Sequence, residues 1–302
     1  MKVGDLGERE LENALRLGLA IQIGGFDICV STALPMVIHD LRRLYSNHEV
    51  SPADVLPDYH VTLRAPGGIR RWFRPQVNFF LDANSPFKPL PQNQGFAMFE
   101  WGLNWCVAAN AHQFLNIHAA VVERGGRALI LPGAPGSGKS TLCAALVCDG
   151  WRLLSDEMTL VGIDDGLVHP FPRPISLKNA SIDVIREIAA ETYIGTVVED
   201  TAKGTVAHMR PPISSVAAGL QTAIPARIVF PRYNSGATAM ELSGLGKGEA
   251  FLNLAENSFN YHVLGESGFE ALSVLVEQCE CFRLEYASLD EAIPAMENLL
   301  AL

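Results

Sequence analysis

The stretch Gly133-Ala134-Pro135-Gly136-Ser137-Gly138-Lys139-Ser140 decides the fold class. It satisfies the pattern G-x-x-x-x-G-K-[ST] in full, with apolar A-L-I-L at 128–131 before it and S-T-L-C-A-A-L-V at 140–147 after it. A strand, a glycine-rich loop and a helix in this order form a P-loop, whose backbone N–H groups and helix N-terminus face phosphate oxygens. The pattern therefore predicts an α/β fold that binds a nucleoside triphosphate.

The chemistry of triphosphate binding assigns roles within this loop. Lys139 is expected to reach the β- and γ-phosphates, and the Ser140 hydroxyl is expected to bind Mg²⁺. Thr141 follows at the first turn of the helix and joins the expected nucleotide-binding set. ATP and Mg²⁺ are therefore the predicted ligands.

Two further features lie at suggestive distances from the lysine. Asp156 and Glu157 follow a predicted strand, 17 residues after Lys139. Adjacent carboxylates at a strand end can hold Mg²⁺ and take a proton from an attacking hydroxyl, whereas switch GTPases and motors carry their second acidic motif further along the chain. His118 lies 21 residues before the lysine, on the strand predicted before the P-loop strand. We expect Lys139, Asp156 and Glu157 to form a catalytic group, with Ser140 and Asp156 as metal ligands. From its position alone, His118 is expected to be a hydrogen-bonded core imidazole, with an active-site role as the alternative.

The first half of the chain predicts a small α+β domain. Alternating apolar residues at 19–23 and 26–30 flank Gly24-Gly25 and indicate a hairpin, and Pro35 opens a helix that runs to about residue 45. Further strands are expected at 59–63, 69–73 and 77–81. The proline-rich loop 84–94 marks the domain boundary, so we predict an N-terminal domain at 1–94 and a P-loop domain at 95–302.

The second half alternates strand and helix after a buried helix at 96–114. Predicted strands cover 117–122, 128–131, 151–154, 159–163, 227–230 and 282–286. Predicted helices cover 138–148, 181–190, 247–254, 268–278 and 289–300. This order is typical of one mixed sheet with flanking helices.

Composition limits the partners and the compartment. The 302 residues carry a formal net charge of −10 and no basic block, which argues against non-specific binding to nucleic acid or to an anionic membrane. No apolar run reaches the length of a membrane-spanning helix and the first twenty residues lack a secretion signal, so we expect a cytoplasmic protein. The six cysteines form no disulfide framework, and Cys279 and Cys281 are expected as buried thiols on one face of a strand.

The run from His118 to Glu157 resembles the catalytic core of bacterial HPr kinase/phosphorylase. More specifically, the chain looks like the HprK-related kinases of the A subgroup, which are often accompanied by a small PqqD-like protein. The motifs that fit the subgroup are W-G-L-N-W-C at 101–106, R-P-I-S-L-K-N at 173–179, D-T-A-K-G-T-V-A-H-M at 200–209 and F-N-Y at 259–261. The resemblance implies a mixed-sheet P-loop kinase core of the HPr kinase and PEP carboxykinase type, self-association, and ATP-dependent phosphorylation of a serine hydroxyl on a small protein or peptide. It also implies that His118 is a catalytic residue near the transferred phosphoryl group.

The chain departs from that family at three places. The family has two aspartates where this chain has Asp156 and Glu157, so either carboxylate is a candidate base. The family's E-x-R-G-x-G signature is replaced by P-F-P-R-P-I-S-L-K-N, and its V-R-P-G-R loop survives at most as M-R-P-P at 209–212, so we expect no phosphorylase activity. The resemblance makes Arg173, Lys178 and Lys203 candidate nucleotide-binding cations; the alternative for each is ordinary surface charge.

Two other functions remain open at this point. One is a small-molecule kinase built on the same core, and the other is a nucleotide-binding assembly protein without catalysis. Phe99, Trp101 and Trp105 are spaced for one helix, and we interpret them as packing residues rather than as a base-stacking platform.

Overall fold

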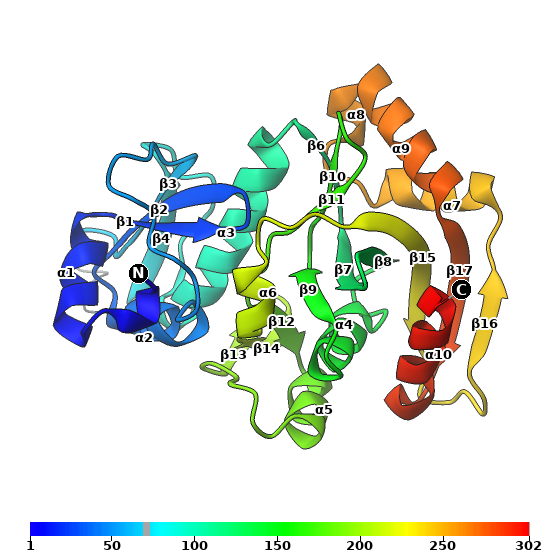
Figure 1. Ribbon diagram of the computed structural model, residues 1–302. Helices are drawn as coiled ribbons and strands as arrows, with labels where there is room; N and C mark the ends of the chain where they lie inside the picture. Colours follow the sequence, from blue (N-terminus) through cyan, green and yellow to red (C-terminus); the bar gives the residue numbers. More distant parts are fainter. Residues whose placement is uncertain (69–72, 302) are drawn as a thin grey trace.

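The computed structural model describes residues 1–68 and 73–301 (Figure 1). It confirms the α/β class: the described strands form four sheets, several of them mixed with helices packed on their faces, and none closes into a barrel. The strand predicted at 69–73 falls almost entirely outside the described residues.

The N-terminal unit is a five-stranded sheet in the order β1-β2-β3-β4-β5. Its strands are β1 (Leu19–Ile23), β2 (Phe26–Thr32), β3 (Tyr59–Arg64), β4 (Gln76–Leu81) and β5 (Leu90–Pro91). The predicted hairpin is confirmed, since β1 and β2 pair in antiparallel register around Gly24-Gly25. The helices are α1 (Glu8–Leu17), which the sequence analysis did not predict, and α2 (Pro35–Leu44), which it did. Short 3₁₀ turns lie at η1 (Val3–Asp5) and η3 (Gln92–Gln94).

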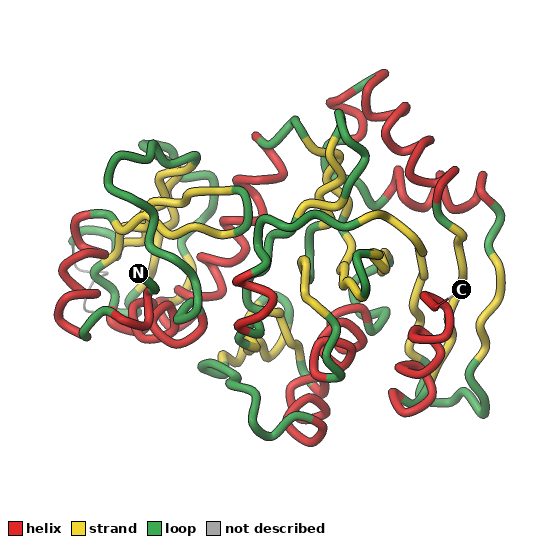
Figure 2. The backbone as a smooth tube through the Cα atoms, viewed as in Figure 1, coloured by secondary structure: helices red, strands yellow, loops and turns green. Residues whose placement is uncertain are grey.

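Helix α3 (Gly95–Asn110) runs between the N-terminal sheet and the rest of the molecule (Figures 1 and 2). It contains no proline and is apolar on most of its circumference, so both neighbours can bury it. A Cβ on Gly102 would overlap the ring of Phe79, which shows how closely the helix lies on β4. The buried side chains of α3 share one hydrophobic cluster with α2 and the N-terminal sheet, so the N-terminal core extends beyond the predicted boundary at residue 94. The helix ends at Asn110 rather than 114, because Phe114 begins the next strand.

The largest sheet has six strands in the order β16-β17-β15-β8-β7-β9. Its strands are β7 (Ala119–Arg124), β8 (Arg127–Pro132), β9 (Arg152–Ser155), β15 (Ile224–Tyr233), β16 (Glu241–Gly244) and β17 (Glu280–Tyr286). β15 runs parallel to β8 and β17, and the other pairs are antiparallel. Alternate residues of β7 and β8 pack into two different clusters, so the sheet is buried on both faces.

Helices cover each face of this sheet. α4 (Lys139–Cys148) and α10 (Leu289–Ala301) pack on one face, and α7 (Lys247–Glu256) and α9 (Glu266–Gln278) pack on the other, joined by α8 (Tyr261–Leu264). All four long helices were predicted within a few residues. Figure 1 shows α7, α8 and α9 at the upper right and α10 at the lower right.

Two three-stranded sheets complete the second half, so the prediction of one sheet is wrong. One is β11-β10-β6, from β6 (Phe114–Ile117), β10 (Thr159–Gly162) and β11 (Val168–His169). The other is β12-β14-β13, from β12 (Ile175–Lys178), β13 (Val198–Thr201) and β14 (Gly204–Met209), with α5 (Ala180–Ile188) and α6 (Ile213–Ala217) beside it. The predicted strand 117–122 is divided at His118, because β6 pairs with β10 whereas β7 pairs with β8 and β9.

Two simpler predictions were checked in the described residues. None of the helices there is both long enough and apolar enough to span a membrane. All six cysteines are free thiols, and Cys279 and Cys281 are buried in the same cluster, as predicted. Cys148 is exposed at the end of α4.

Candidate functional site

The P-loop lies between β8 and the first turn of α4. Gly136 and Gly138 have φ values of +86° and +91°, in the left-handed region that favours glycine. The ammonium group of Lys139 donates a hydrogen bond to the carbonyl of Gly133, so the loop curves around its own cation. Because the helix begins at Lys139, its N-terminal N–H groups and its positive dipole end face the loop. This is the geometry of an anion site.

The loop is held from outside by two tyrosines of the C-terminal third. The hydroxyl of Tyr286, on β17, donates a 3.2 Å hydrogen bond to the carbonyl of Gly138. The backbone N–H of Tyr233, on β15, donates to the carbonyl of Ser137 at 2.9 Å. Neither tyrosine was assigned to the site from the sequence, since nothing in their local sequence indicates contacts with residues 96 and 148 positions away.

Asp156 follows β9 and is buried. Its Oδ2 accepts the backbone N–H of Ser176 at 2.9 Å, and its Oδ1 is buried without a hydrogen-bond partner among the described residues. Burial first, and then the negative charge of Glu157, raise the pKa of Asp156 to about 6, although Lys178 and hydrogen bonds from Ser176 and Ser140 act in the opposite direction. The carboxyl group therefore lies beside the P-loop serine that the sequence assigned to Mg²⁺.

Glu157 is held through both of its carboxylate oxygens. Lys178 donates to Oε1 at 3.2 Å, and the side-chain amide of Asn104 donates to Oε2. Burial alone would raise the pKa of Glu157, but Lys178, Lys203 and Arg173 outweigh it and lower this pKa to about 2. The two adjacent carboxyl groups thus have pKa values pushed in opposite directions.

Three lysines surround this acidic pair. Lys178 ends β12, and Lys203 lies in the turn between β13 and β14 with its ammonium group 5.0 Å from the ring centroid of Trp101. Burial lowers the pKa of Lys139 to about 8, with Asp156 and Glu157 raising it and the other two lysines lowering it. The structure therefore brings Lys139, Lys178 and Lys203 together near the acidic pair.

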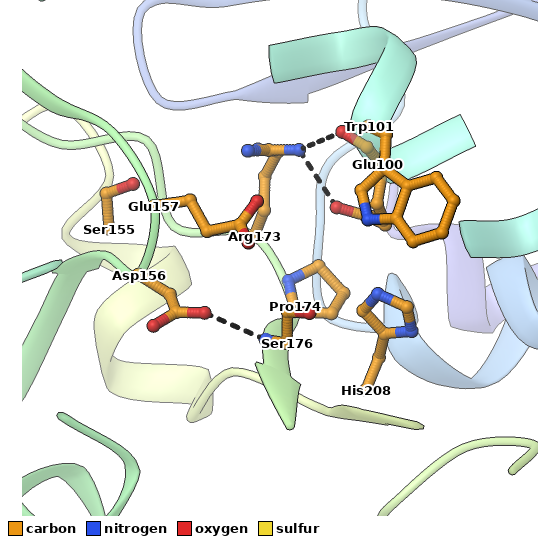
Figure 3. Close-up of a pocket in the computed structure, with 9 residues that line it drawn as sticks. All are labelled: Glu100, Trp101, Ser155, Asp156, Glu157, Arg173, Pro174, Ser176 and His208. Atoms are coloured by element: carbon orange, nitrogen blue, oxygen red, sulfur yellow. Dashed lines mark hydrogen bonds and ion pairs between the residues drawn. The ribbon is translucent and has the colours of Figure 1, made fainter. Parts of the chain in front are cut away.

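Arg173 takes a different place from the one predicted for a phosphate ligand. It is 5% exposed, and its Nη1 donates to the carbonyl oxygen of Glu100 at 3.1 Å and to Oε2 of Glu100 at 2.9 Å. Its Nη2 donates to the amide oxygen of Asn104, and the hydroxyl of Tyr45 donates to the other oxygen of Glu100 at 2.6 Å. Figure 3 shows the guanidinium group directed toward α3. Its charge is paired with a carboxylate of the N-terminal core.

His118 lies at the bend between β6 and β7 rather than within a strand. Its backbone N–H donates to the carbonyl of Asn257 at 2.7 Å, and its ring lies 5.5 Å from the ring of Phe259, centroid to centroid. Burial, and next the charge of Lys139, lower the pKa of His118 to about 4, with Glu157 acting against them. The imidazole is thus neutral at pH 7 and within electrostatic range of the lysine and the acid.

A small polar pocket adjoins the acidic pair (Figure 3). Its free volume is about 10 Å³, close to the space that one water molecule needs. It is lined by Glu100, Trp101, Ser155, Asp156, Glu157, Arg173, Pro174, Ser176 and His208. Five of its buried polar atoms have no hydrogen-bond partner among the described residues: Trp101 Nε1, Asp156 Oδ1, Arg173 Nε, Ser176 Oγ and His208 Nε2.

A family model matches the segment that contains this site. Residues 96–210 are similar to ScmC, described as SynChlorMet cassette protein ScmC. The matched segment begins in α3 and ends just after β14, and it includes the P-loop, the acidic pair and the three lysines. The comparison with curated proteins found no match.

The resemblance to HPr kinase/phosphorylase and to the HprK-related kinases is therefore wrong as an identification. The family model that matches is ScmC, and it covers less than half of the chain.

The residues assigned to Mg²⁺ fit that ion. The Ser140 hydroxyl and the unpartnered Oδ1 of Asp156 are hard oxygen ligands on neighbouring elements. Mg²⁺ is usually held by one or two protein oxygens together with substrate phosphates and water. In the described residues no group of three or more His, Cys, Asp or Glu side chains is placed to hold a metal by itself.

Several residues of the site were not assigned to it from sequence. Glu100, Asn104 and Trp101 lie on α3, within the W-G-L-N-W-C motif or directly before it, and Trp101 faces Lys203 as well as packing in the helix. The sequence shows this motif, but the prediction of a buried helix did not indicate that its polar side chains lie next to Glu157 and Arg173.

Proposed function

We propose that this protein is an ATP-dependent phosphotransferase. It binds ATP and Mg²⁺ at the loop 133–140 and transfers the γ-phosphate to a hydroxyl group of a small protein or peptide. The observation that carries the proposal is that Asp156 and Glu157 lie near enough to the P-loop lysine to raise its pKa, with Lys178 and Lys203 beside the same acidic pair.

The loop supplies the binding step. Backbone N–H groups between Gly133 and Gly138 and the N-terminus of α4 offer hydrogen bonds to phosphate oxygens. Lys139 exchanges its hydrogen bond with the Gly133 carbonyl for contacts with the phosphates, and Thr141 lies in the same first turn. Ser140 and Asp156 would hold Mg²⁺, and the ion would neutralise charge on the phosphates.

The acidic pair supplies the proton chemistry. The acceptor hydroxyl group gives its proton to a carboxylate while its oxygen forms a bond to the γ-phosphorus. The bond between the γ-phosphorus and the oxygen that bridges to the β-phosphate breaks, and ADP leaves with that oxygen. Separated pKa values indicate separate roles for two neighbouring carboxyl groups. Asp156 is adjacent to Ser140 and suits the metal, so Glu157 is left to orient the acceptor hydroxyl and take its proton. A low pKa is compatible with this role, because in a loose transition state positioning matters more than basicity.

Two lysines could stabilise the negative charge that develops on the transferred phosphoryl group. Lys178 and Lys203 approach the acidic pair from β12 and from the β13–β14 turn. Both remain partly exposed, so they can reach phosphate oxygens as well as Glu157. Electrostatic stabilisation by such groups is a large part of catalysis in phosphoryl transfer.

The size of the pocket favours a macromolecular acceptor over a small molecule. The pocket that Asp156 and Glu157 line has a free volume of about 10 Å³, so this pocket by itself is too small to enclose a metabolite. A protein or peptide can present one hydroxyl group to the acidic pair from outside. A nucleotide-binding assembly protein remains the second candidate, because Glu157 and Arg173 are both engaged by α3.

The test combines binding and transfer. Titration calorimetry with ATP and Mg²⁺ should show binding to the wild-type chain and to Lys88→Ala, an exposed lysine, but not to Lys139→Ala. Labelled ATP should then transfer phosphate to a protein encoded next to this one in the genome. Label on a metabolite alone would favour the small-molecule kinase, and tight binding without transfer would favour the assembly protein.

A further inference from the structure

Asn104 connects the N-terminal unit to the acidic pair. Its side chain lies between Arg173 and Glu157, and each end of the amide is used. The amide oxygen accepts from the guanidinium group of Arg173, and the amide nitrogen donates to Oε2 of Glu157. A residue of α3, 53 positions before Glu157 in the chain, therefore touches the carboxylate proposed to take the acceptor proton.

The orientation of this amide is fixed by its neighbours. Arg173 has only donors, so the oxygen of Asn104 must face it and the nitrogen must face Glu157. Arg173 is itself held by the carboxylate and the backbone carbonyl of Glu100, and Glu100 accepts a hydrogen bond from Tyr45. The contacts among Tyr45, Glu100 and Arg173 are buried, and the two hydrogen bonds of Asn104 are partly buried, so water competes less for these groups than it would at the surface.

The two oxygens of Glu157 are thus held from opposite elements. Lys178 of β12 holds Oε1, and Asn104 of α3 holds Oε2. The side chain of Lys178 is 32% exposed, and a single contact with it leaves the carboxylate free to rotate. The second hydrogen bond, from a rigid helix, removes that freedom.

We propose that Asn104 is a positioning residue, which holds the Glu157 carboxylate in the orientation needed for phosphoryl transfer. This inference rests on the role given to Glu157 in the proposed function. It makes α3 part of the reaction site, although Asn104 itself touches neither the nucleotide nor the reacting atoms.

Two substitutions separate this role from a structural one. Asn104→Ala removes both contacts. Asn104→Asp keeps an oxygen for Arg173 but faces Glu157 with a second carboxylate in place of a donor. Asn110→Ala is the matched control, since Asn110 lies on the same helix and its side-chain amide donates to the carbonyl of Cys106. Circular dichroism and thermal melting check that each variant folds.

The readout is ATP hydrolysis, with water as the acceptor probe, alongside the Kd for ATP. Both Asn104 variants should lower turnover at saturating ATP by about 10- to 100-fold, the effect of a misplaced catalytic group, while the Kd stays within about twofold. In a Glu157→Gln background, Asn104→Ala should cause no further loss, because both changes act on one group. Normal turnover in Asn104→Asp, or an equal loss in both backgrounds, would overturn the proposal.

A crystal structure of Asn104→Ala keeps the test independent of the proposed function. If the wild-type chain binds no ATP, or binds it without turnover, the proposed function fails. The position of the Glu157 carboxylate still decides the inference. It should move or show two conformers in the variant, and an unchanged, single position would contradict a positioning role.

Discussion

The hydroxyl of Tyr286 donates a hydrogen bond to the carbonyl of Gly138 across 3.2 Å. This contact joins β17, the last strand of the six-stranded sheet in chain order, to the residue before the P-loop lysine. A Cβ on Gly138 would lie 2.6 Å from the Tyr286 hydroxyl and 2.9 Å from Cβ of Tyr233, so the loop is fitted against both tyrosines. The shape of the loop depends on residues almost a hundred positions or more away from it.

The first prediction follows from this fit. Gly138→Ala should abolish ATP binding, because the backbone has φ of +91° and the added methyl group meets Tyr286 and Tyr233. The backbone strain alone costs about 1–3 kcal/mol. Gly136→Ala is the control, since it has a similar φ of +86° but open space at its Cβ. Calorimetric titration with ATP and chemical unfolding measure the two effects, and equal binding by the two variants would contradict the role of the tyrosines.

The second prediction concerns the buried pair of Arg173 and Glu100, whose side chains are 6% and 5% exposed. Arg173→Met should destabilise the protein by about 3 kcal/mol or more, since it leaves a carboxylate buried without its cation. Arg283→Met breaks a pair that is 56% and 51% exposed and should cost less than about 1 kcal/mol.

Urea unfolding at pH 8 measures both losses. Arg173→Met combined with Glu100→Met should recover most of the stability, because no buried charge then remains. A loss for Arg173→Met as small as that for Arg283→Met would show that the pair contributes nothing.

The third prediction is a loss of stability in acid. Burial lowers the pKa of His48 to about 4, while the backbone carbonyl of Pro172, 2.9 Å from its Nε2, acts in the opposite direction. The unfolded chain binds a proton near pH 6.5, where the folded chain does not, so the free energy of unfolding falls as the pH is lowered from about 6.5 to 4. This one group accounts for about 3 kcal/mol over that range.

Urea unfolding at a series of pH values between 4 and 7 measures that slope. His48→Gln should reduce the slope by this contribution and leave the share of the other histidines whose pKa is lowered by burial, such as His118. His112→Gln, at an exposed histidine, is the control because it removes no buried imidazole. A wild-type slope that His48→Gln does not reduce would assign the acid sensitivity elsewhere.

The fourth prediction sets stability against activity at Asp156. Burial and the charge of Glu157 raise its pKa to about 6, so the ionised form is unfavourable in the folded protein above that pH. Asp156→Asn should therefore raise the melting temperature at pH 8, since an amide oxygen can still accept from the backbone of Ser176. It should also lower turnover by about 100-fold or more through loss of the Mg²⁺ ligand. A variant that is less stable and fully active would contradict both parts.

Local patterns in the sequence were enough to predict the P-loop, the hairpin β1–β2 and the helices α4, α7, α9 and α10. Each depends on residues within about a turn or a strand of one another, such as Gly24-Gly25 and Gly133–Ser140. The sheet β12-β14-β13 was not predicted, because its strands have four to six residues and adjoin prolines and glycines that indicate loops.

The contacts of the candidate site depend on long-range pairing. Arg173 contacts Glu100, which lies 73 positions away in the sequence, and Asn104 contacts Glu157, which lies 53 positions away. No local sequence pattern predicts either contact. The residue types that bear the chemistry were predictable, whereas the partners that fix their orientation were not.

The bend at His118 has a consequence for the matched segment 96–210. The backbone of His118 is hydrogen-bonded to Asn257, and the neighbouring Ile117 forms a bridge with Ser258. Both partners lie outside the region similar to ScmC. A candidate site residue within that region is therefore anchored by a segment beyond it, so residues 96–210 expressed alone, or joined to a foreign C-terminal third, would lose the anchor of His118 together with the tyrosines that support the P-loop.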